Sequence, residues 1–369
     1  MSQLNVDTIK KADGTGNLSV PAETGTVVTT ASPSLGRRNI ILNGSMAVAQ
    51  RGTSGSVETS PSYGVDRFYG IKQTGTLGWS QETEAPANFK NSLKLTNSAV
   101  GSGFCQFVQK IEGQNMAHLN FGSSDAQTIT LSFYVRSSIA GDYALAFRNA
   151  IPNRAYATQY TINTADTWEK KTVTIVGDTS GTWATDNSAG MNIIWGLGSS
   201  STTSTVDQWT ATTNFFATGS TNWFATNGST FYITGVQLEV GSVATPFEHR
   251  SFGEELLACQ RYYQSPITTN TSRTYTVGGR SDGTTGTVFL WPLATIMRAQ
   301  PSVSQTGTGW RAFLYNTSAG STEGPNVLNY STNAPFLSLT VGGFSGFTDN
   351  RSLNMCPDNL TKLSFDAEL

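Results

Sequence analysis

The sequence is poor in charged residues and in the residue types that most often carry out catalysis. Charged residues make up 13% of the 369 positions, against roughly 25% in typical soluble domains. The formal net charge is only −2, and there are two histidines. Because the chain has no basic footprint, duplex nucleic acid is not expected as a partner.

Cysteine is also scarce. The three cysteines, Cys105, Cys259 and Cys356, are far apart and follow neither a disulfide framework nor a CxxC metal-binding spacing. We therefore expect three buried thiols. No dense acidic loop for calcium is present, although Asp66 in "GVDRF" is a weak candidate that more simply pairs with Arg67 or Arg136, or caps a turn. The sequence thus predicts no metal and no cofactor.

Long apolar runs are missing as well. No run approaches the roughly 20 residues that a membrane-spanning helix needs. The opening "MSQLNVDTIKKADGTGNLSV" lacks the charged-then-apolar order of a signal peptide. We expect no membrane insertion, and a product made in the cytoplasm that leaves its cell, if it does, without general secretion.

Glycine is abundant, with 37 residues, and runs of serine and threonine favour short strands joined by turns. "TITLSFYVR" places Ile129, Leu131, Phe133 and Val135 on one face, which predicts a half-buried strand. "GDYALAF", "AYATQYTI" and "KKTVTI" alternate similarly, and the denser "MNIIWGL" predicts a strand covered on both faces. Turn residues at short spacing between them predict an antiparallel sandwich over 37–250.

The alternation slips once, in "TFYITGVQLEV". Five apolar residues share the pattern, but the last three are shifted by one position: Phe231, Ile233, Val236, Leu238 and Val240. Gly235 lies at the slip. A bulge at Gly235 returns all five side chains to one face, so we predict a bulge there.

A helix is predicted directly after the sandwich. "SFGE" is a capping box, in which Ser251 and Glu254 each satisfy the other's backbone N–H. An apolar stripe follows at helical spacing: Phe252, Leu256, Cys259 and Tyr263. We predict a helical link over 251–266, ending near Pro266, whose stripe packs the flanking domains together or against another subunit.

The two ends of the chain differ from the middle. Residues 1–36 contain only two short apolar patches, Val6 with Ile9 and Val27 with Val28, which are too few for a core of their own. We expect this segment to become ordered only against a partner or against other copies of the chain. Residues 267–369 resume strand alternation and are long enough for a second, smaller β-sandwich.

Several phrases are similar to those of a known family. "NIILNGSMAVAQRGTS", "TITLSFYVRSSIAGDY" and, above all, "FYITGVQLEVGSVATPFEHRSFGEELLACQRYYQ" resemble a module of bacteriophage tail fibres and other virion appendages, especially those of marine and cyanobacterial phages. The opening "LNVDTIKKADGTGNLSVPAETGTVVTTAS" resembles their virion-attachment ends. The resemblance covers nearly the whole chain and is weakest in the last hundred residues.

This resemblance implies a fold and an assembly. The expected architecture is all-β, with a virion-attachment segment (1–36) and a jelly-roll sandwich like a carbohydrate-binding module (37–250). A helical link (251–266) and a distal β-domain (267–369) follow. It further implies a homotrimer that docks through Val6, Ile9, Val27 and Val28 to other phage tail or capsid proteins. A long fibre, a short spike and a head decoration all remain open.

Tryptophans in polar loops are candidates for sugar binding, because the apolar C–H faces of pyranose rings lie against flat aromatic rings. Three tryptophans lie in loops rich in Gly, Ser, Thr and Asn: Trp183, Trp209 and Trp223. The alternative is that each fills a gap beneath its loop or packs against another subunit. We assign Trp168, Trp195 and Trp291 to the core, and expect Trp310 to be exposed.

Catalytic motifs are absent. The sequence has no HExxH and no nucleophile elbow, and the two histidines, His118 and His249, are interpreted as structural. Five carboxylates in one half of the sandwich leave a glycosidase pair open: Asp166, Glu169, Asp178, Asp186 and Asp207. We expect a non-enzymatic tail fibre or spike protein in the virion that binds host-surface polysaccharide. A purely architectural decoration and, less favoured, a polysaccharide depolymerase are the alternatives.

Overall fold

The computed structural model describes residues 37–369 except 152, 199–201, 212–215, 268–276, 308, 315–316, 322–325, 331–334, 346, 348–350 and 358–359. The predicted attachment residues Val6, Ile9, Val27 and Val28 lie outside the described residues. Residues 38–369 form one compact unit. Its described part is built from strands, with two short α-helices, α1 (Gly113–Met116) and α2 (Phe252–Gln260), so the predicted all-β class is confirmed.

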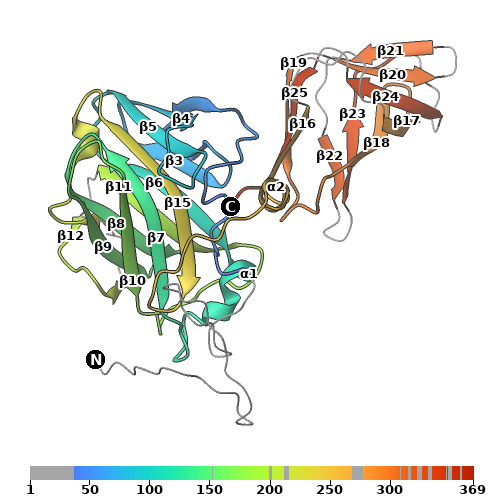
Figure 1. The fold of residues 1–369 in the computed structure, drawn as a ribbon. Coiled ribbons are helices and arrows are strands. Elements are labelled where there is room, and N and C mark those ends of the chain that lie inside the picture. Colours follow the sequence, from blue (N-terminus) through green and yellow to red (C-terminus); the bar gives the residue numbers. More distant parts are fainter. Residues whose placement is uncertain are drawn as a thin grey trace, which may run out of the picture. The chain divides into compact units, whose positions relative to one another are not determined.

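Two antiparallel sheets form the sandwich (Figure 1). The six-stranded sheet has the order β1 (Ser54–Val57), β4 (Thr76–Glu82), β5 (Ser92–Ala99), β15 (Thr230–Val240), β7 (Ile129–Ser137) and β10 (Glu169–Ile175). The seven-stranded sheet has the order β13 (Trp209–Thr210), β9 (Ala155–Ile162), β8 (Gly141–Asn149), β11 (Ala189–Gly198), β6 (Cys105–Glu112), β3 (Phe68–Lys72) and β2 (Ser62–Tyr63). Strands β12 (Thr202–Thr203) and β14 (Phe216–Ala217) form a separate parallel pair. Two 3-10 turns, η1 (Ala117–Leu119) and η2 (Trp223–Ala225), complete this part of the chain.

The core between the two sheets follows the predicted alternation. Ile129, Leu131, Phe133 and Val135 of β7 are all fully buried. Strand β11 is covered on both faces, as predicted, because Trp195 points into this core whereas Ile194 belongs to an apolar cluster on the other side. The assignment of Trp195 to the core is therefore confirmed.

The predicted bulge in β15 is confirmed. The register of β15 against β7 shifts between Thr234 and Gln237, and Gly235 has a φ of +61°, a conformation that side-chain-bearing residues rarely adopt. Phe231 and Val236, on either side of the slip, both lie in the core. A Cβ at Gly235 would also lie 2.6 Å from Cζ of Phe89, so the position requires glycine for two reasons.

The C-terminal part contains two further sheets with their own core. One has the order β16 (Tyr263–Ile267), β25 (Leu360–Asp366) and β19 (Ser302–Gly307). The other has the order β21 (Thr317–Ser321), β20 (Trp310–Leu314), β24 (Ser352–Pro357), β17 (Val277–Asp282), β18 (Gly286–Pro292), β23 (Phe336–Val341) and β22 (Asn326–Tyr330).

Two tryptophans lie in this second core. Trp291 is buried there, as predicted. The prediction that Trp310 is exposed is wrong: its ring packs against Phe289, and its Nε1 donates to the side chain of Gln305 at 2.8 Å. The single N–H donor of the Trp310 ring is thus satisfied, and its apolar atoms are buried, inside the domain.

Helix α2 begins as predicted but has a different inward face. Ser251 and Glu254 form the complete capping box. The helix ends at Gln260, and Tyr263 begins strand β16, so the predicted helical link to residue 266 is too long. Residues 263–267 pair with β25 as strand β16 and do not continue the helix, and Pro266 lies within β16.

The predicted apolar stripe is therefore only partly correct. Phe252 is 60% exposed and does not pack the two core regions together, whereas Cys259 and Tyr263 are buried. Leu256 is half-buried. The buried side of the helix instead includes Glu255, whose carboxylate has partners from distant segments. In the described chain no helix is long and apolar enough to cross a membrane.

Candidate functional site

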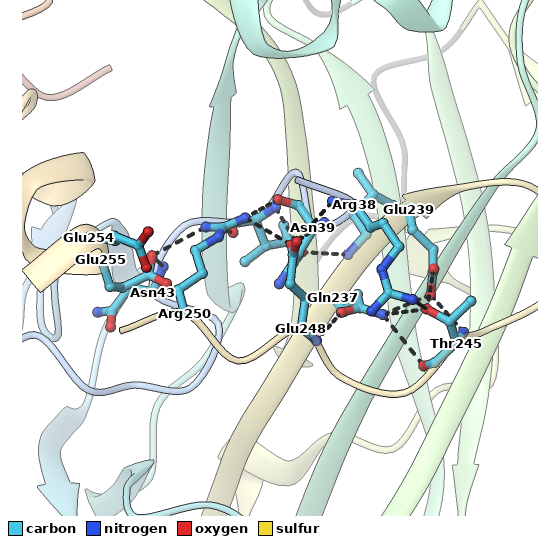
Figure 2. Close-up of polar contacts among 12 residues, drawn as sticks. Arg38, Asn39, Asn43, Gln237, Glu239, Thr245, Glu248, Arg250, Glu254 and Glu255 are labelled. Atoms are coloured by element: carbon cyan, nitrogen blue, oxygen red, sulfur yellow. Dashed lines mark hydrogen bonds and ion pairs between the residues drawn. The ribbon is translucent and has the colours of Figure 1, made fainter. Parts of the chain in front are cut away.

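The residues that follow β15 build a dense polar cluster, which we call the joint. It comprises Arg38, Asn39, Asn43, Gln237, Glu239, Thr245, Glu248, Arg250 and Glu255 (Figure 2). These side chains come from four segments: the stretch 38–43, strand β15, the connection 241–251, and helix α2. The segment with the strongest resemblance to virion appendages thus contacts residues 38–43, at the beginning of the sandwich.

The first layer of the joint fixes the end of β15. The carboxylate of Glu239, only 3% exposed, accepts hydrogen bonds from the Thr245 N–H at 2.9 Å and the Thr245 hydroxyl at 2.6 Å. The Asn39 amide donates to the carbonyl of Val236 at 3.0 Å, and its oxygen accepts from the Leu238 N–H at 3.1 Å. Because buried polar groups need partners, these bonds hold the stretch 38–43 against β15 beside the bulge.

The second layer fixes helix α2. Arg250 donates to the Ile41 carbonyl at 3.2 Å and lies 3.5 Å from carboxylate oxygens of both Glu248 and Glu255. Glu255 also accepts the Asn43 N–H at 2.5 Å. A buried carboxylate is costly unless it is paired and hydrogen-bonded. Glu255 is both, which explains why it, and not Phe252, faces inward.

A cluster of buried charges next to the joint connects the sandwich with the C-terminal part. The Arg67 guanidinium lies 3.5 Å from the centre of the Tyr262 ring and pairs with Glu368. Glu112, 1% exposed, accepts two hydrogen bonds from Arg261, at 2.6 and 3.0 Å, and one from the Tyr262 hydroxyl at 2.5 Å. Burial raises the pKa of Tyr262 to about 12, and the hydrogen bonds with Glu112 raise the pKa of Arg261.

Residues 366–369 are held by cations of the sandwich. Arg51 lies 3.1 Å from Asp366 and 3.3 Å from Glu368. Lys110 donates to the Leu369 carbonyl at 2.6 Å. The void beside these contacts has a volume of about 10 Å³, at the lower limit for a single water. This void therefore does not enclose anything larger than a water, and the surrounding contacts connect residues 366–369 to the sandwich.

A second feature lies on the outer face of the six-stranded sheet, and we call it the aromatic surface: Phe89, Tyr134, Trp168, Tyr232, Phe247 and His249. The Phe89 ring lies 5.4 Å from Tyr134, 5.0 Å from Phe247 and 5.3 Å from His249, between ring centres. Trp168 packs edge-on against Tyr232 at 6.0 Å. Trp168 is half-buried on this face, so its assignment to the core is wrong.

One feature of the sequence indicates this surface. Tyr134 and Arg136 lie on the polar face of "TITLSFYVR". This face points away from the core between the sheets, so an aromatic ring there is not needed for core packing. Phe89 and Phe247 belong to loops, and only the folded chain brings them to Tyr134. His249, interpreted as structural, contributes ring contacts with Phe89 and Phe247.

The tryptophans predicted to bind sugar are mostly buried. Trp223 is fully buried, and its Nε1 donates to the Thr230 carbonyl at 3.1 Å, so the prediction of an exposed binding residue is wrong there. The 3-10 turn η2 directs this ring into the core. Trp183, 7% exposed, packs edge-on against Phe121 at 4.9 Å and against Trp209 at 5.4 Å. Trp209 is half-buried and is the most accessible of the three.

The candidate catalytic carboxylates each have local partners. Asp178 is 1% exposed and accepts two hydrogen bonds from Arg154, at 2.6 and 2.7 Å. The other four carboxylates also contact nearby side chains. Asp166 lies 3.8 Å from Arg136, and Glu169 accepts hydrogen bonds from Lys171 and Asn163. Asp186 accepts a hydrogen bond from Ser188, and Asp207 accepts one from Thr158. Each of the five carboxylates is thus engaged with a neighbouring side chain.

Metal binding also has little basis in the described residues. In these parts of the chain no group of three or more His, Cys, Asp or Glu side chains could hold an ion. Asp66 accepts the Gln50 N–H at 2.9 Å and lies 4.0 Å from Arg51. Burial raises the pKa of Asp66, although Arg51 and Gln50 oppose this. Asp66 therefore pairs with Arg51, not with the predicted Arg67 or Arg136, and its carboxylate caps the turn at residues 50–51, which agrees with the second predicted role.

A small cavity of about 80 Å³ lies against the seven-stranded sheet, where Ala144, Gly196, Phe216, Ser220 and Asn222 line it. Its apolar floor and polar rim are of a kind found in ligand sites, but typical ligand pockets are ≈ 300–1,000 Å³. The cavity is too small to enclose a sugar ring.

Neither a known family model nor a curated protein matches the chain. Among solved structures, the enzymatically active domain of tailspike protein 4 of bacteriophage CBA120 is similar over 55% of this chain, with 12% identity and a TM-score of 0.32. The match spans only 21% of that tailspike chain. The family 11 carbohydrate-binding module of a Clostridium thermocellum cellulase is similar over 52% of this chain and 98% of the module, with 11% identity and a TM-score of 0.28. The module TmCBM61, solved with β-1,4-galactotriose, is similar over its whole length and over 56% of this chain, with 10% identity and a TM-score of 0.25.

Proposed function

We propose that this chain is a non-enzymatic structural protein of a phage tail fibre, spike or other virion appendage that mediates adhesion to host-surface glycans. In this proposal residues 1–36 dock on other virion proteins, and three copies assemble into a trimer. The sandwich and the C-terminal sheets form the outward part. The virion is the expected location of the mature protein.

The observation that carries the proposal is the joint. The long irregular phrase that resembles virion appendages supplies Glu239, Glu248, Arg250, Glu255 and Arg261, and each of these residues is used in the connection. The resemblance therefore falls on residues with a shared structural task. A chain that fixes two β-units through buried charges is suited to an appendage, which must keep its outer part in position on the particle.

The aromatic surface supports the adhesive part of the proposal. Tyr232 is buried, but the other rings of this surface are half-buried or exposed. They offer flat apolar area to sugar rings, with polar side chains nearby for hydroxyl groups. A single such site is weak. In a trimer, and with several trimers on one particle, the effective concentration of neighbouring sites raises the overall avidity by orders of magnitude.

A purely architectural role is the second candidate, and one observation favours it. Trp183 and Trp223 are buried within the sandwich and do not line a groove. A depolymerase is less favoured because the candidate carboxylates are engaged with neighbouring side chains. These alternatives differ in whether the chain binds glycan at all and whether it shortens the polymer.

The proposal is tested on two levels with the full chain. Mass spectrometry of purified particles of the phage that encodes the chain is expected to find it at a fixed copy number, and its absence from the particle would overturn the virion assignment. Binding of the purified chain to host cells and to a glycan array tests adhesion. Binding to neither supports the architectural role, and release of reducing sugar from a bound polymer supports the depolymerase.

A further inference from the structure

The aromatic surface has a regular arrangement across the six-stranded sheet. Lys94 of β5, Tyr232 of β15 and Arg136 of β7 are direct cross-strand neighbours in one row. Both cations lie close to the Tyr232 ring, with Arg136 at 5.1 Å and Lys94 at 5.3 Å from its centre. Trp168 packs on the same ring, so this row is aromatic at its centre and cationic on both sides.

A parallel row lies two residues further along the strands. It contains Thr234 of β15, Tyr134 of β7 and Lys170 of β10, again as direct cross-strand neighbours. Side chains two positions apart on a strand share a face and lie roughly 7 Å apart. Phe89 packs beside Tyr134, with the two rings tilted by 56°, and fills the space that the absent side chain of Gly235 leaves. The bulge in β15 thus has a direct role in shaping this surface.

The composition of the face distinguishes a sugar ligand from a protein partner. The side chains that point outward from β5, β7, β10 and the part of β15 before its bulge are aromatic, hydroxyl-bearing or cationic. They are Ser92, Lys94, Thr96, Ser98, Thr130, Ser132, Tyr134, Arg136, Lys170, Thr172, Thr174, Tyr232 and Thr234. None is aliphatic. Protein interfaces usually have an apolar centre with few charges. Packed rings bordered by hydroxyl groups and cations match the alternating apolar faces and polar edges of a pyranose chain.

The charges on this face favour an acidic ligand. Three carboxylates lie on or beside this face. Glu84 and Asp166 both interact with Arg136, and Glu82 of β4, opposite Ser92, accepts a hydrogen bond from the Ser80 hydroxyl at 2.6 Å. Among the described residues, this leaves Lys94 and the exposed Lys170 to interact with negative charge on a ligand. We infer that the aromatic surface binds an acidic polysaccharide, with pyranose rings on Tyr134 and Trp168 and ligand carboxylates at Lys94 and Lys170. This inference rests on the proposed glycan adhesion and names its site and ligand class.

The test measures retention of the full chain in native gels that contain polygalacturonate or alginate, with neutral dextran as the matched polymer. The expected result is retention by an acidic polymer, weakened by salt, and little retention by dextran. Trp168→Ala and Lys170→Glu are each expected to weaken the affinity by about threefold to tenfold. Lys170 is exposed, so its substitution keeps the test valid if Trp168→Ala impairs folding.

Two matched control variants test whether the binding site lies on the aromatic surface. Trp209→Ala removes a half-buried tryptophan of the seven-stranded sheet, and Arg280→Glu reverses an exposed charge in the C-terminal part. Neither is expected to change retention. If Trp209→Ala abolishes binding while the Trp168 and Lys170 variants bind normally, the inference is wrong and the adhesion proposal stands.

The remaining outcomes are equally decisive. Equal retention by dextran and the acidic polymers overturns the acidic ligand class. No retention by any of the three polymers overturns the inference, and binding on the glycan array then decides separately whether adhesion survives. A change in native mass caused by Lys170→Glu, measured by light scattering, overturns the inference by identifying the surface as a contact between subunits.

Discussion

The guanidinium of Arg67 lies 3.5 Å from the centre of the Tyr262 ring, and both side chains are buried. Arg67 precedes strand β3 of the sandwich, whereas Tyr262 lies between helix α2 and strand β16. The contact joins segments almost two hundred positions apart in the sequence. It is reinforced by the ion pair of Arg67 with Glu368 and by its hydrogen bond to the Lys110 carbonyl at 2.8 Å.

Replacing Arg67 with Met is expected to lower the stability of the chain strongly. The substitution removes one of the two cations at the buried Glu368 carboxylate, so that only Arg51, at 3.3 Å, remains. Breaking a buried pair typically costs about 3–5 kcal/mol, and we expect a loss at or below the lower end of this range. Differential scanning calorimetry measures the loss as a lower melting temperature. Arg280→Met, at a pair whose side chains are both at least half exposed, should cost at most about 1 kcal/mol. Equal melting temperatures for the two variants would contradict the role of Arg67.

Replacing Gly235 with Ala is expected to destabilise the sandwich. The left-handed backbone alone costs about 1–3 kcal/mol for a residue with a side chain, and the new Cβ also meets Phe89. The matched control is Gly253→Ala in helix α2, where nothing lies within 4 Å of the new Cβ. There alanine should stabilise the helix by up to about 1 kcal/mol. Thermal denaturation followed by circular dichroism compares the two, and a neutral Gly235→Ala would argue against the bulge.

Removing the capping box is expected to weaken helix α2. Ser251→Ala deletes the side chain that accepts the Glu254 N–H, at a cost of about 1 kcal/mol. Ser251→Asp keeps an acceptor at this position and should retain most of the stability. Hydrogen exchange of the first helical turn is the direct measurement. Faster exchange in both variants would show that the acceptor does not matter.

The stability of the chain is expected to fall at high pH. Burial raises the pKa of Tyr63, Tyr69, Tyr143 and Tyr262 from the ordinary 10.0 to about 12. Because the folded values lie above the unfolded value, the stabilisation is complete below pH 10 and is lost as the pH rises through about 12. Ultraviolet absorbance of phenolate should show a late group of tyrosines that ionises together with unfolding. Ionisation of all tyrosines near pH 10 in the folded chain would contradict this.

Phe252 tests the predicted contact between subunits. Its side chain is 60% exposed in the single chain, so Phe252→Ser should change the stability of an isolated subunit by at most about 0.5 kcal/mol. In a trimer that buries this ring, the same substitution should lower the native mass in light scattering. A large loss of stability without a change in mass would mean that the ring is covered within its own chain.

The strands of the sandwich were predictable because their signal is local. Ile129 and Leu131 alternate with polar residues, and Gly235 lies at the only position that restores the phase of β15. The cap at Ser251 is equally local, since its partner is three residues away. In each case the residues that decide the structure are close together in the sequence.

The inward face of α2 and the tryptophan positions were not predictable in this way. Glu255 is buried because Asn43 and Arg250 meet its carboxylate, and Asn43 lies 212 positions away. Trp223 has Thr, Asn and Phe as neighbours, which suit an exposed loop, but its loop turns back into the core. Such outcomes depend on which distant segment supplies a partner, and a single sequence does not contain that information in periodic form.

The three native thiols have a practical consequence. Cys105, Cys259 and Cys356 are at most 1% exposed, and burial raises the pKa of Cys105 and Cys259. A thiol that stays protonated and out of contact with water reacts slowly with maleimides. A single cysteine introduced at Val243, which is 71% exposed, would therefore take up a fluorophore selectively in the otherwise natural chain. Individual copies of this protein are thus open to single-molecule imaging without prior removal of any native cysteine.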